Sequence, residues 1–247
     1  MMNENIEELK DLFTNIKKKG WIKSKGKGNS AIGRTFEYLL NKEEDSFEIP
    51  DFAGIELKTT RKVTNQNIGL FNANPDGTYL FEAERIRMNY GYPSECKRFK
   101  IFCTSIYAHQ IHLIKQNNFE IKVNYKEEKV VLHISKPNLV VDDTTFWSFD
   151  LLKEKLERKL NYLALVEAKY MVIDSIEYFK YEKMTIYKNV NFNSFINLID
   201  NGKVGVSFKM SAFKSGARYG QVHNHGTGFT ILSDFLPDMY STVEKVD

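Results

Sequence analysis

Two carboxylates and an amine lie close together in the segment EIPDFAGIELKTTR, where Asp51, Glu56 and Lys58 are interleaved with the apolar Ile55 and Leu57. Because side chains alternate faces along a strand, Glu56 and Lys58 would share one face, about 6–7 Å apart, with the apolar pair on the other. Carboxylates that converge at one end of a strand suit Mg²⁺, and a neighbouring lysine can orient a water or neutralise charge on phosphorus. The alternative is a solvent-facing charged strand edge, since this spacing also recurs by chance.

The elements around this segment would have to bring its side chains together. Pro50 stops whatever precedes it, and Gly54 lets the backbone bend without steric cost. The alternation that follows predicts a strand over 54–59. A helix predicted over 31–42 lies just upstream and carries Glu37, which can reach the same site. We therefore expect a carboxylate-rich site where this helix meets the strand.

The remaining patterns predict a mixed α/β fold with one central sheet. Helical spacing predicts helices over 4–18, 149–160 and 191–202. Single strands are expected at 68–71, 99–107, 119–125, 129–135, 144–149, 162–173, 203–210 and 226–232. Residues 176–190 resemble a hairpin-like pair of strands, and 211–225 resemble a loop.

The charge of the chain is unevenly distributed, although its net value is only +3 over 247 residues. No acid occurs between Asp11 and Glu37 or between Asp200 and Asp234. The cations in these two spans are Lys17, Lys18, Lys19, Lys23, Lys25, Lys27 and Arg34, then Lys203, Lys209, Lys214 and Arg218 with His223 and His225. Together they could form one positive surface of the kind that binds a phosphate backbone, or remain two solvated lysine-rich loops.

The N-terminus is acidic and amphipathic, which is not typical of a secretory signal. No apolar run approaches the length of a membrane span. We expect a cytoplasmic protein that does not bind membranes.

The motif PDFAGIELK, residues 50–58, matches the PD-(D/E)XK nuclease signature. The wider block GNSAIGRTFEYLLNKEEDSFEIPDFAGIELKT, residues 28–59, resembles the MvaI/BcnI restriction endonuclease family and, more distantly, the mismatch-repair nicking enzyme MutH. Residues 211–229 resemble the C-terminal recognition region of that family, and WSFD at 147–150 also fits. The resemblance spans most of the chain and is weak over 73–140.

This resemblance implies a PD-(D/E)XK, MutH-like fold with a central mixed sheet flanked by helices. It implies Asp51, Glu56 and Leu57 as the metal-binding set, Lys58 as the catalytic lysine and Glu37 as the helix carboxylate of the catalytic set. The implied activity is that of a type II restriction endonuclease. One or two Mg²⁺ ions, for which Mn²⁺ can substitute, would support hydrolysis of double-stranded DNA to 5′-phosphate ends.

The resemblance also implies how such an enzyme is organised. We expect a single endonuclease domain over residues 1–247, with two lobes around a DNA cleft. The catalytic core would come from about 1–72 and 140–200, and the recognition elements from about 73–140 and 203–232. Enzymes of this kind often act as monomers, and we expect a monomer here.

Two sets of basic residues are the predicted DNA contacts. Arginine and histidine in the second set can reach guanine O6 and N7 in the major groove. The predicted contacts are Lys25, Lys27 and Arg34 near the N-terminus, and Lys209, Lys214, Arg218, His223 and His225 near the C-terminus. Ser207, Lys209 and Thr230 stand where family members carry base-contacting Asp and Arg, so the resemblance does not give the target sequence.

Three other functions remain open at this point. The first is a strand-specific repair nickase similar to MutH, and the second is a catalytically silent DNA-binding module. The third is a nucleotide-binding P-loop, because GNSAIGRT nearly matches that motif. Arg34 replaces its lysine, however, and no buried strand precedes it. An HxH zinc site at His223 and His225 lacks an evident third ligand.

Overall fold

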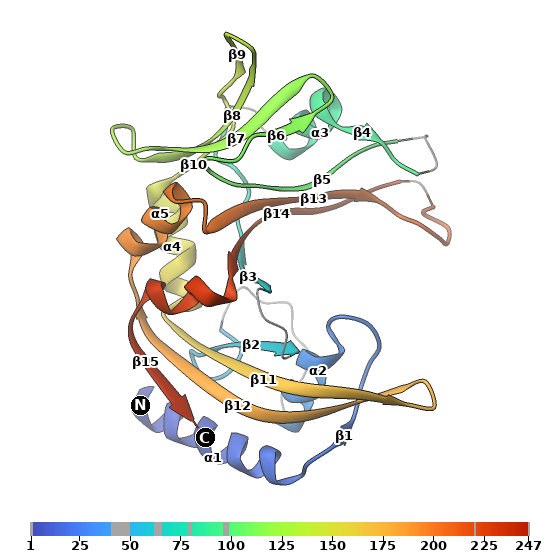
Figure 1. Cartoon of the computed structure of the whole chain (residues 1–247), viewed down its shortest axis with the longest axis vertical. Helices are drawn as coiled ribbons and strands as arrows, with labels where there is room; N and C mark the ends of the chain where they lie inside the picture. The colour runs from blue at the N-terminus through green and yellow to red at the C-terminus, as the bar shows by residue number, and fades with distance from the viewer. Residues whose placement is uncertain are drawn as a thin grey trace. The chain divides into compact units, whose positions relative to one another are not determined.

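The computed structural model describes residues 2–40, 50–61, 66–78, 81–95, 99–219 and 221–246, with only the main chain of 222 and 224. The chain forms two compact units. Unit 1 comprises Met1–Gln66, Leu156–Asn191 and Pro237–Asp247, and unit 2 comprises Asn67–Lys155 and Phe192–Leu236. Each unit is described by itself below, with the element labels of Figure 1.

Unit 1 is built on one mixed sheet. Its elements are α1 (Met2–Lys18), β1 (Ile22–Lys23), α2 (Ala31–Leu39), β2 (Glu56–Arg61), β11 (Tyr162–Ile173), β12 (Ile176–Val190) and β15 (Tyr240–Val246). The strand order is β1-β12-β11-β2, and β15 also pairs with β12. Strand β2 runs parallel to β11, while the other pairs are antiparallel. Among the described residues, the strand that carries Glu56 and Lys58 is therefore an edge strand of this sheet.

The core of unit 1 lies between this sheet and its two helices. Helix α1 buries Ile6, Leu9, Phe13 and Ile16, which recur at helical spacing and form a single apolar face. The predicted helix over 4–18 is thus confirmed. Helix α2 starts at Ala31, as predicted; its predicted end at 42 lies outside the described residues.

The described residues of unit 2 form two further five-stranded sheets. One has the order β3-β14-β13-β5-β4; the other has the order β10-β8-β7-β6, with β9 paired to β8. The elements are β3 (Asn67–Asn72), α3 (Glu82–Tyr90), β4 (Tyr92–Pro93), β5 (Lys100–Ile106), β6 (His112–Ile114), β7 (Asn117–Asn124), β8 (Lys129–Lys136), β9 (Leu139–Asp142), β10 (Phe146–Ser148), α5 (Phe192–Asp200), β13 (Val204–Ala212) and β14 (Val222–Leu232). Helix α4 (Phe149–Leu160) and the 3₁₀ helix η1 (Ser233–Met239) each contribute residues to both units.

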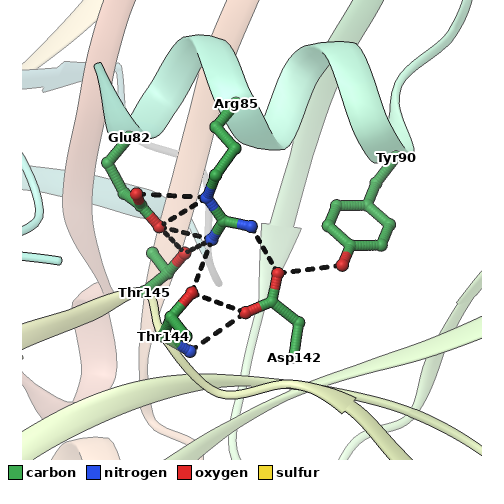
Figure 2. Close-up of polar contacts among 6 residues, drawn as sticks. All are labelled: Glu82, Arg85, Tyr90, Asp142, Thr144 and Thr145. Atoms are coloured by element: carbon green, nitrogen blue, oxygen red, sulfur yellow. Dashed lines mark hydrogen bonds and ion pairs between the residues drawn. The ribbon is translucent and has the colours of Figure 1, made fainter. Parts of the chain in front are cut away.

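A buried polar network fixes helix α3 within unit 2 (Figure 2). The guanidinium of Arg85 donates hydrogen bonds to Glu82, to Asp142 and, over 2.7 Å, to the hydroxyl of Thr145. Tyr90 donates to the same Asp142 carboxylate over 2.9 Å. Burial, together with this carboxylate, raises the pKa of Tyr90 to about 12. The network joins α3 to the β9–β10 segment.

The structure confirms a mixed α/β fold and corrects three details. The described residues form three sheets rather than one central sheet. Residues 176–190 form one long strand, β12, rather than a hairpin-like pair. His223 and His225 lie on β14 rather than in a loop. Helix α3 and strand β15 were not predicted.

The described residues include no helix with both the length and the apolar character needed to cross a membrane.

Candidate active site

A two-residue turn precedes strand β2. Phe52 and Ile55 exchange main-chain hydrogen bonds of 2.9 and 2.7 Å, which close the turn. Its two central residues, Ala53 at φ 44° and Gly54 at φ 90°, are both left-handed, as a tight type I′ turn requires. Glycine adopts this conformation at no steric cost. The bend that the sequence predicts at Gly54 is therefore present.

This turn brings the first carboxylate to the second. Because Phe52 pairs with Ile55 in antiparallel fashion, Asp51 lies opposite Glu56. The Oδ2 atom of Asp51 accepts a hydrogen bond of 3.0 Å from the amide of Leu57. The spacing of four residues between the two acids thus follows from the shortest hairpin turn.

The alternation of side chains along strand β2 places the amine of Lys58 as predicted. Ile55 and Leu57 belong to the hydrophobic core of unit 1. On the other face, the Nζ atom of Lys58 lies 2.6 Å from Oε1 of Glu56. The structure therefore brings Asp51, Glu56 and Lys58 into one constellation.

Glu56 is a buried carboxylate, only 1% exposed. Burial raises the pKa of Glu56, and the charge of Asp51 acts in the same direction, while Lys58 and Lys159 oppose the rise. Its second oxygen, Oε2, is buried and has no hydrogen-bond partner among the described residues. A solvent-facing charged strand edge is therefore excluded for Glu56.

Two residues from distant parts of the sequence also interact electrostatically with this carboxylate. The Nζ atom of Lys159, near the end of α4, is 3.6 Å from Oε1 of Glu56. Tyr240 is buried, and its pKa is raised by burial first and then by the charges of Tyr187 and Glu56. Neither residue was predicted from the sequence. Lys159 is one of several lysines on an amphipathic helix, and no local pattern distinguishes it.

Glu37 shares a pocket with Lys58. The pocket has a volume of about 280 Å³, and Leu57 and Thr59 also line it. On helix α2, a Cβ atom at Gly33 would lie 3.3 Å from the hydroxyl of Thr59 and 3.7 Å from Oε1 of Glu37. The missing side chain at Gly33 thus leaves room between the helix and the strand. The structure accordingly places all four predicted catalytic residues around α2 and β2.

The oxygen atoms at this site fit a hard divalent cation. The described residues contain no ready-made cluster of three or more His, Cys, Asp or Glu side chains for a metal. Asp51 and Glu56 offer two carboxylates, and Leu57 could contribute only its carbonyl. That carbonyl points to the same edge as the Leu57 amide, which contacts Asp51, because both groups of a strand residue face the same side. Mg²⁺ prefers an arrangement of few protein ligands and several waters.

The predicted DNA contacts in unit 1 lie around the start of α2. Lys25 and Lys27 are exposed, and the ammonium of Lys25 lies 4.0 Å from the centre of the Tyr38 ring. Arg34 donates a hydrogen bond of 3.0 Å to the carbonyl of Lys27. Asn29 and Arg34 line the same pocket as Lys58.

Among the predicted contacts in unit 2, Lys209 lies on β13 of the β3-β14-β13-β5-β4 sheet, whereas Lys214 and Arg218 follow the end of that strand. Residues directly opposite each other on paired strands share a face. The pairs Ser207–Ser105 and Lys209–Cys103 put hydroxyls, a thiol and an ammonium on that face, and Ser105 and Ser207 lie 2.6 Å apart. Lys214 is 81% exposed and lies 3.8 Å from Glu95.

At the end of the β13–β14 hairpin, four side chains lie in contact. The ring of Phe213 lies 4.0 Å from that of His223 at an interplanar angle of 11°, and His223 lies 3.8 Å from His225. The guanidinium of Arg218 covers Phe213 at 4.2 Å. Desolvation, His225 and Arg218 all lower the pKa of His223. A neutral imidazole carries one donor and one acceptor nitrogen, which suits it to contacts with base edges.

Comparison with known proteins gives a consistent result. The MvaI/BcnI restriction endonuclease family matches residues 10–240. Restriction endonuclease MvaI in complex with its cognate DNA substrate is 29% identical, with a TM-score of 0.91 and 99% of both chains covered. MvaI in the absence of DNA is 28% identical, with a TM-score of 0.62 and coverage of 99% of this chain and 98% of that one. No significant match was found among curated proteins.

Proposed function

The chain belongs to the MvaI/BcnI restriction endonuclease family, and from this premise we propose that it is a type II restriction endonuclease. It hydrolyses phosphodiester bonds of double-stranded DNA at a short specific sequence, requires Mg²⁺ and leaves 5′-phosphate ends. The fold of unit 1 is then the catalytic core of a PD-(D/E)XK nuclease. The similarity to an MvaI–DNA complex supports duplex DNA as the substrate.

One observation carries this proposal: Glu56 is buried opposite Asp51 and beside Lys58, and its Oε2 atom has no hydrogen-bond partner among the described residues. A buried carboxylate oxygen without a partner is costly unless something else binds it. The site would hold a divalent cation through Asp51, Glu56 and the carbonyl of Leu57. When bound, Mg²⁺ polarises a phosphoryl oxygen and lowers the pKa of water.

The chain's own side chains supply the remaining chemistry. The ammonium of Lys58, anchored by Glu56, can donate hydrogen bonds to the attacking water or to a phosphate oxygen as negative charge develops there. Glu37 lines the same pocket and can orient a water in it. Burial of the Glu56 carboxylate keeps bulk water from competing for these contacts.

The recognition chemistry belongs to unit 2. Lys209, Arg218, His223 and His225 are the proposed base-reading residues, and Lys214 is a proposed phosphate contact. Ser105, Ser207 and Thr230 add hydroxyls, with Thr230 3.5 Å from Ser207. In unit 1, Lys25 and Lys27 are proposed phosphate contacts. We further propose that the enzyme acts as a monomer, which sedimentation with and without DNA tests.

The test is digestion of supercoiled plasmid by the purified protein with Mg²⁺, with Mn²⁺ and with a chelator. We expect linear product with either metal and no product with the chelator. Sequencing the ends of genomic fragments then gives the target and the cut position. Open circles that never become linear would indicate a MutH-like nickase instead. Salt-sensitive binding without any product would indicate a DNA-binding module without catalysis.

A further inference from the structure

Residues 23–30 of unit 1, here called the basic loop, are tied to their surroundings through the main chain. The amide of Ser24 donates a hydrogen bond of 2.8 Å to the carbonyl of Glu177 on β12. The amide of Lys25 donates one of 2.9 Å to the hydroxyl of Thr35 on α2. The path of the loop is thus fixed from two different elements.

Arg34 holds the middle of the basic loop from inside. Its Nη2 atom donates a hydrogen bond of 3.0 Å to the carbonyl of Lys27. A Cβ atom at Gly26 would lie 2.8 Å from the same nitrogen, so the guanidinium packs where a side chain would otherwise be. The glycine and the arginine together define the turn of the loop.

Arg61 holds the other end of the basic loop. Lying at the end of β2, it donates hydrogen bonds of 3.3 and 3.4 Å to the carbonyls of Gly28 and Asn29. The same guanidinium donates to the carboxylate of Glu177 over 2.8 and 3.2 Å. Tyr170 contributes a ring 5.6 Å away. One side chain thus connects the active-site strand, the β11–β12 hairpin and the basic loop.

These contacts depend on the shape of a guanidinium. Its planar fork can donate in several directions at once, which an ammonium on a flexible stem cannot do in a fixed geometry. The side chain of Arg61 is 20% exposed and its donors already bind partners within the protein. Arg61 is therefore placed to organise the loop rather than to bind a ligand directly.

The basic loop presents its lysines at the surface from this fixed backbone. Lys23, Lys25 and Lys27 are all exposed. A pocket of about 530 Å³ is lined by Lys23 and Lys27, and its other wall is the tip of the β11–β12 hairpin. The last residues of the loop line the second pocket, which also contains Lys58. The row of cations therefore runs from the hairpin tip to the candidate active site.

We propose that the basic loop is a pre-organised clamp for the phosphate backbone of duplex DNA next to the scissile linkage, and that Arg61 is the positioning residue that fixes it. This inference rests on the proposed function. A fixed loop binds with less loss of conformational freedom, because the ordering occurs on folding. The clamp reads no bases, so its contribution to affinity is independent of sequence and sensitive to salt.

The lysines are tested by the salt dependence of binding. The probe is a 30-base-pair duplex that the wild-type enzyme does not cut, titrated by fluorescence anisotropy in a chelator at several salt concentrations. Lys25→Ala and Lys27→Ala should each reduce the slope of log K against log salt by about one. Lys153→Ala, at an exposed position on α4, is the control and should leave the slope unchanged. Unchanged slopes in both loop variants would overturn the clamp.

Arg61 is tested by separating affinity from slope. Arg61→Gln and Arg61→Lys should both weaken binding about tenfold, because the loop loses its anchor, but should keep the wild-type slope, because no phosphate contact is removed. A slope reduced by about one in Arg61→Gln would make Arg61 a direct contact. Unchanged affinity would make it a structural cross-link only. Either result refutes the positioning role.

Two controls make these outcomes separable. Thermal melting shows whether Arg61→Gln is folded; if it is not, Glu177→Gln, which removes the charge of the partner carboxylate, takes its place with the same expected loss of affinity. Plasmid cleavage by the wild type is measured in parallel. If the wild type cleaves but the lysine variants keep its slope, the clamp alone is refuted. If the wild type shows no cleavage and no duplex binding, the proposed function is refuted together with the clamp.

Discussion

The Nζ atom of Lys58 lies 2.6 Å from Oε1 of Glu56, a carboxylate that is 1% exposed. The lysine is itself partly exposed, so it connects a buried charge to the surface of the pocket that also contains Glu37. A buried carboxylate with a single strong ion pair and an unpartnered second oxygen is poorly satisfied without a further cation. This relationship makes the site testable residue by residue.

The first prediction concerns catalysis. Asp51→Asn, Glu56→Gln and Lys58→Met preserve shape but remove the charge, and each should slow plasmid cleavage by at least about a hundredfold. Duplex binding should survive, because the proposed phosphate contacts of the basic loop and the proposed base contacts of unit 2 are unchanged. Cleavage time courses and gel shifts measure the two effects. Lys153→Met, on the exposed side of α4, is the matched control and should cut normally.

The second prediction concerns the metal. A ligand that binds only the folded state raises the melting temperature. Adding Mg²⁺ should therefore raise the melting temperature of the wild type and have no such effect on Glu56→Gln. In a chelator the variant should melt no lower than the wild type, because burial disfavours the charged form of this carboxylate. An equal rise in both proteins would show that the cation binds elsewhere.

The third prediction concerns Lys159, whose ammonium lies 3.6 Å from Oε1 of Glu56. A second positive charge at the carboxylate opposes binding of a cation there. Lys159→Met should therefore lower the Mg²⁺ concentration needed for half-maximal cleavage several-fold. The same titration on Lys153→Met gives the background of losing a lysine from this helix. A higher Mg²⁺ requirement would contradict this role and favour a direct contact with substrate.

The sequence predicted the local part of the site, because parity and a short turn are properties of neighbouring residues. Asp51, Glu56 and Lys58 could be placed from alternation along one strand and the bend at Gly54. Lys159 lies more than a hundred residues beyond Glu56 in the sequence, so only the folded sheet brings the two together.

Strand β12 shows why some elements were predicted wrongly. Among its buried positions, Phe179 and Tyr181 are followed by Met184 and Ile186, so the parity changes from odd to even, and Tyr187 beside them is buried as well. The ladder with β11 shifts register at this point, which is the signature of a bulge. When the alternation of buried residues shifts by one position within a strand, the sequence pattern resembles that of two separate strands. The number of sheets likewise depends on pairing between distant strands, which alternation within a strand does not encode.

The fourth prediction concerns the network around Arg85 (Figure 2). Arg85→Met should destabilise the protein by about 3–5 kcal/mol, because the change leaves the buried carboxylates of Glu82 and Asp142 without their cation. Urea unfolding measures this loss. Although burial raises the pKa of Asp142, the hydrogen bonds from Arg85 and Thr144 lower it overall. This contribution to stability is fully present at pH values above 3.8, the ordinary pKa of this carboxyl, and is lost as the pH falls through the lowered pKa of Asp142. A loss of unfolding free energy below about 1 kcal/mol would mean that the ion pairs of Arg85 contribute no more than weak surface pairs do.

The fifth prediction concerns the stack at the end of the β13–β14 hairpin. Phe213 lies between the guanidinium of Arg218 and the ring of His223, so it aligns two proposed base-reading side chains. Phe213→Leu keeps the apolar volume but removes the flat faces on which both partners rest. We expect cleavage at the target site to fall about tenfold or more, because one good base contact contributes about 1–3 kcal/mol. Affinity for a duplex without the site should stay unchanged, since the proposed phosphate contacts remain. Parallel loss of both affinities would instead show that the stack binds the DNA backbone, and a wild-type rate at the target would remove it from recognition.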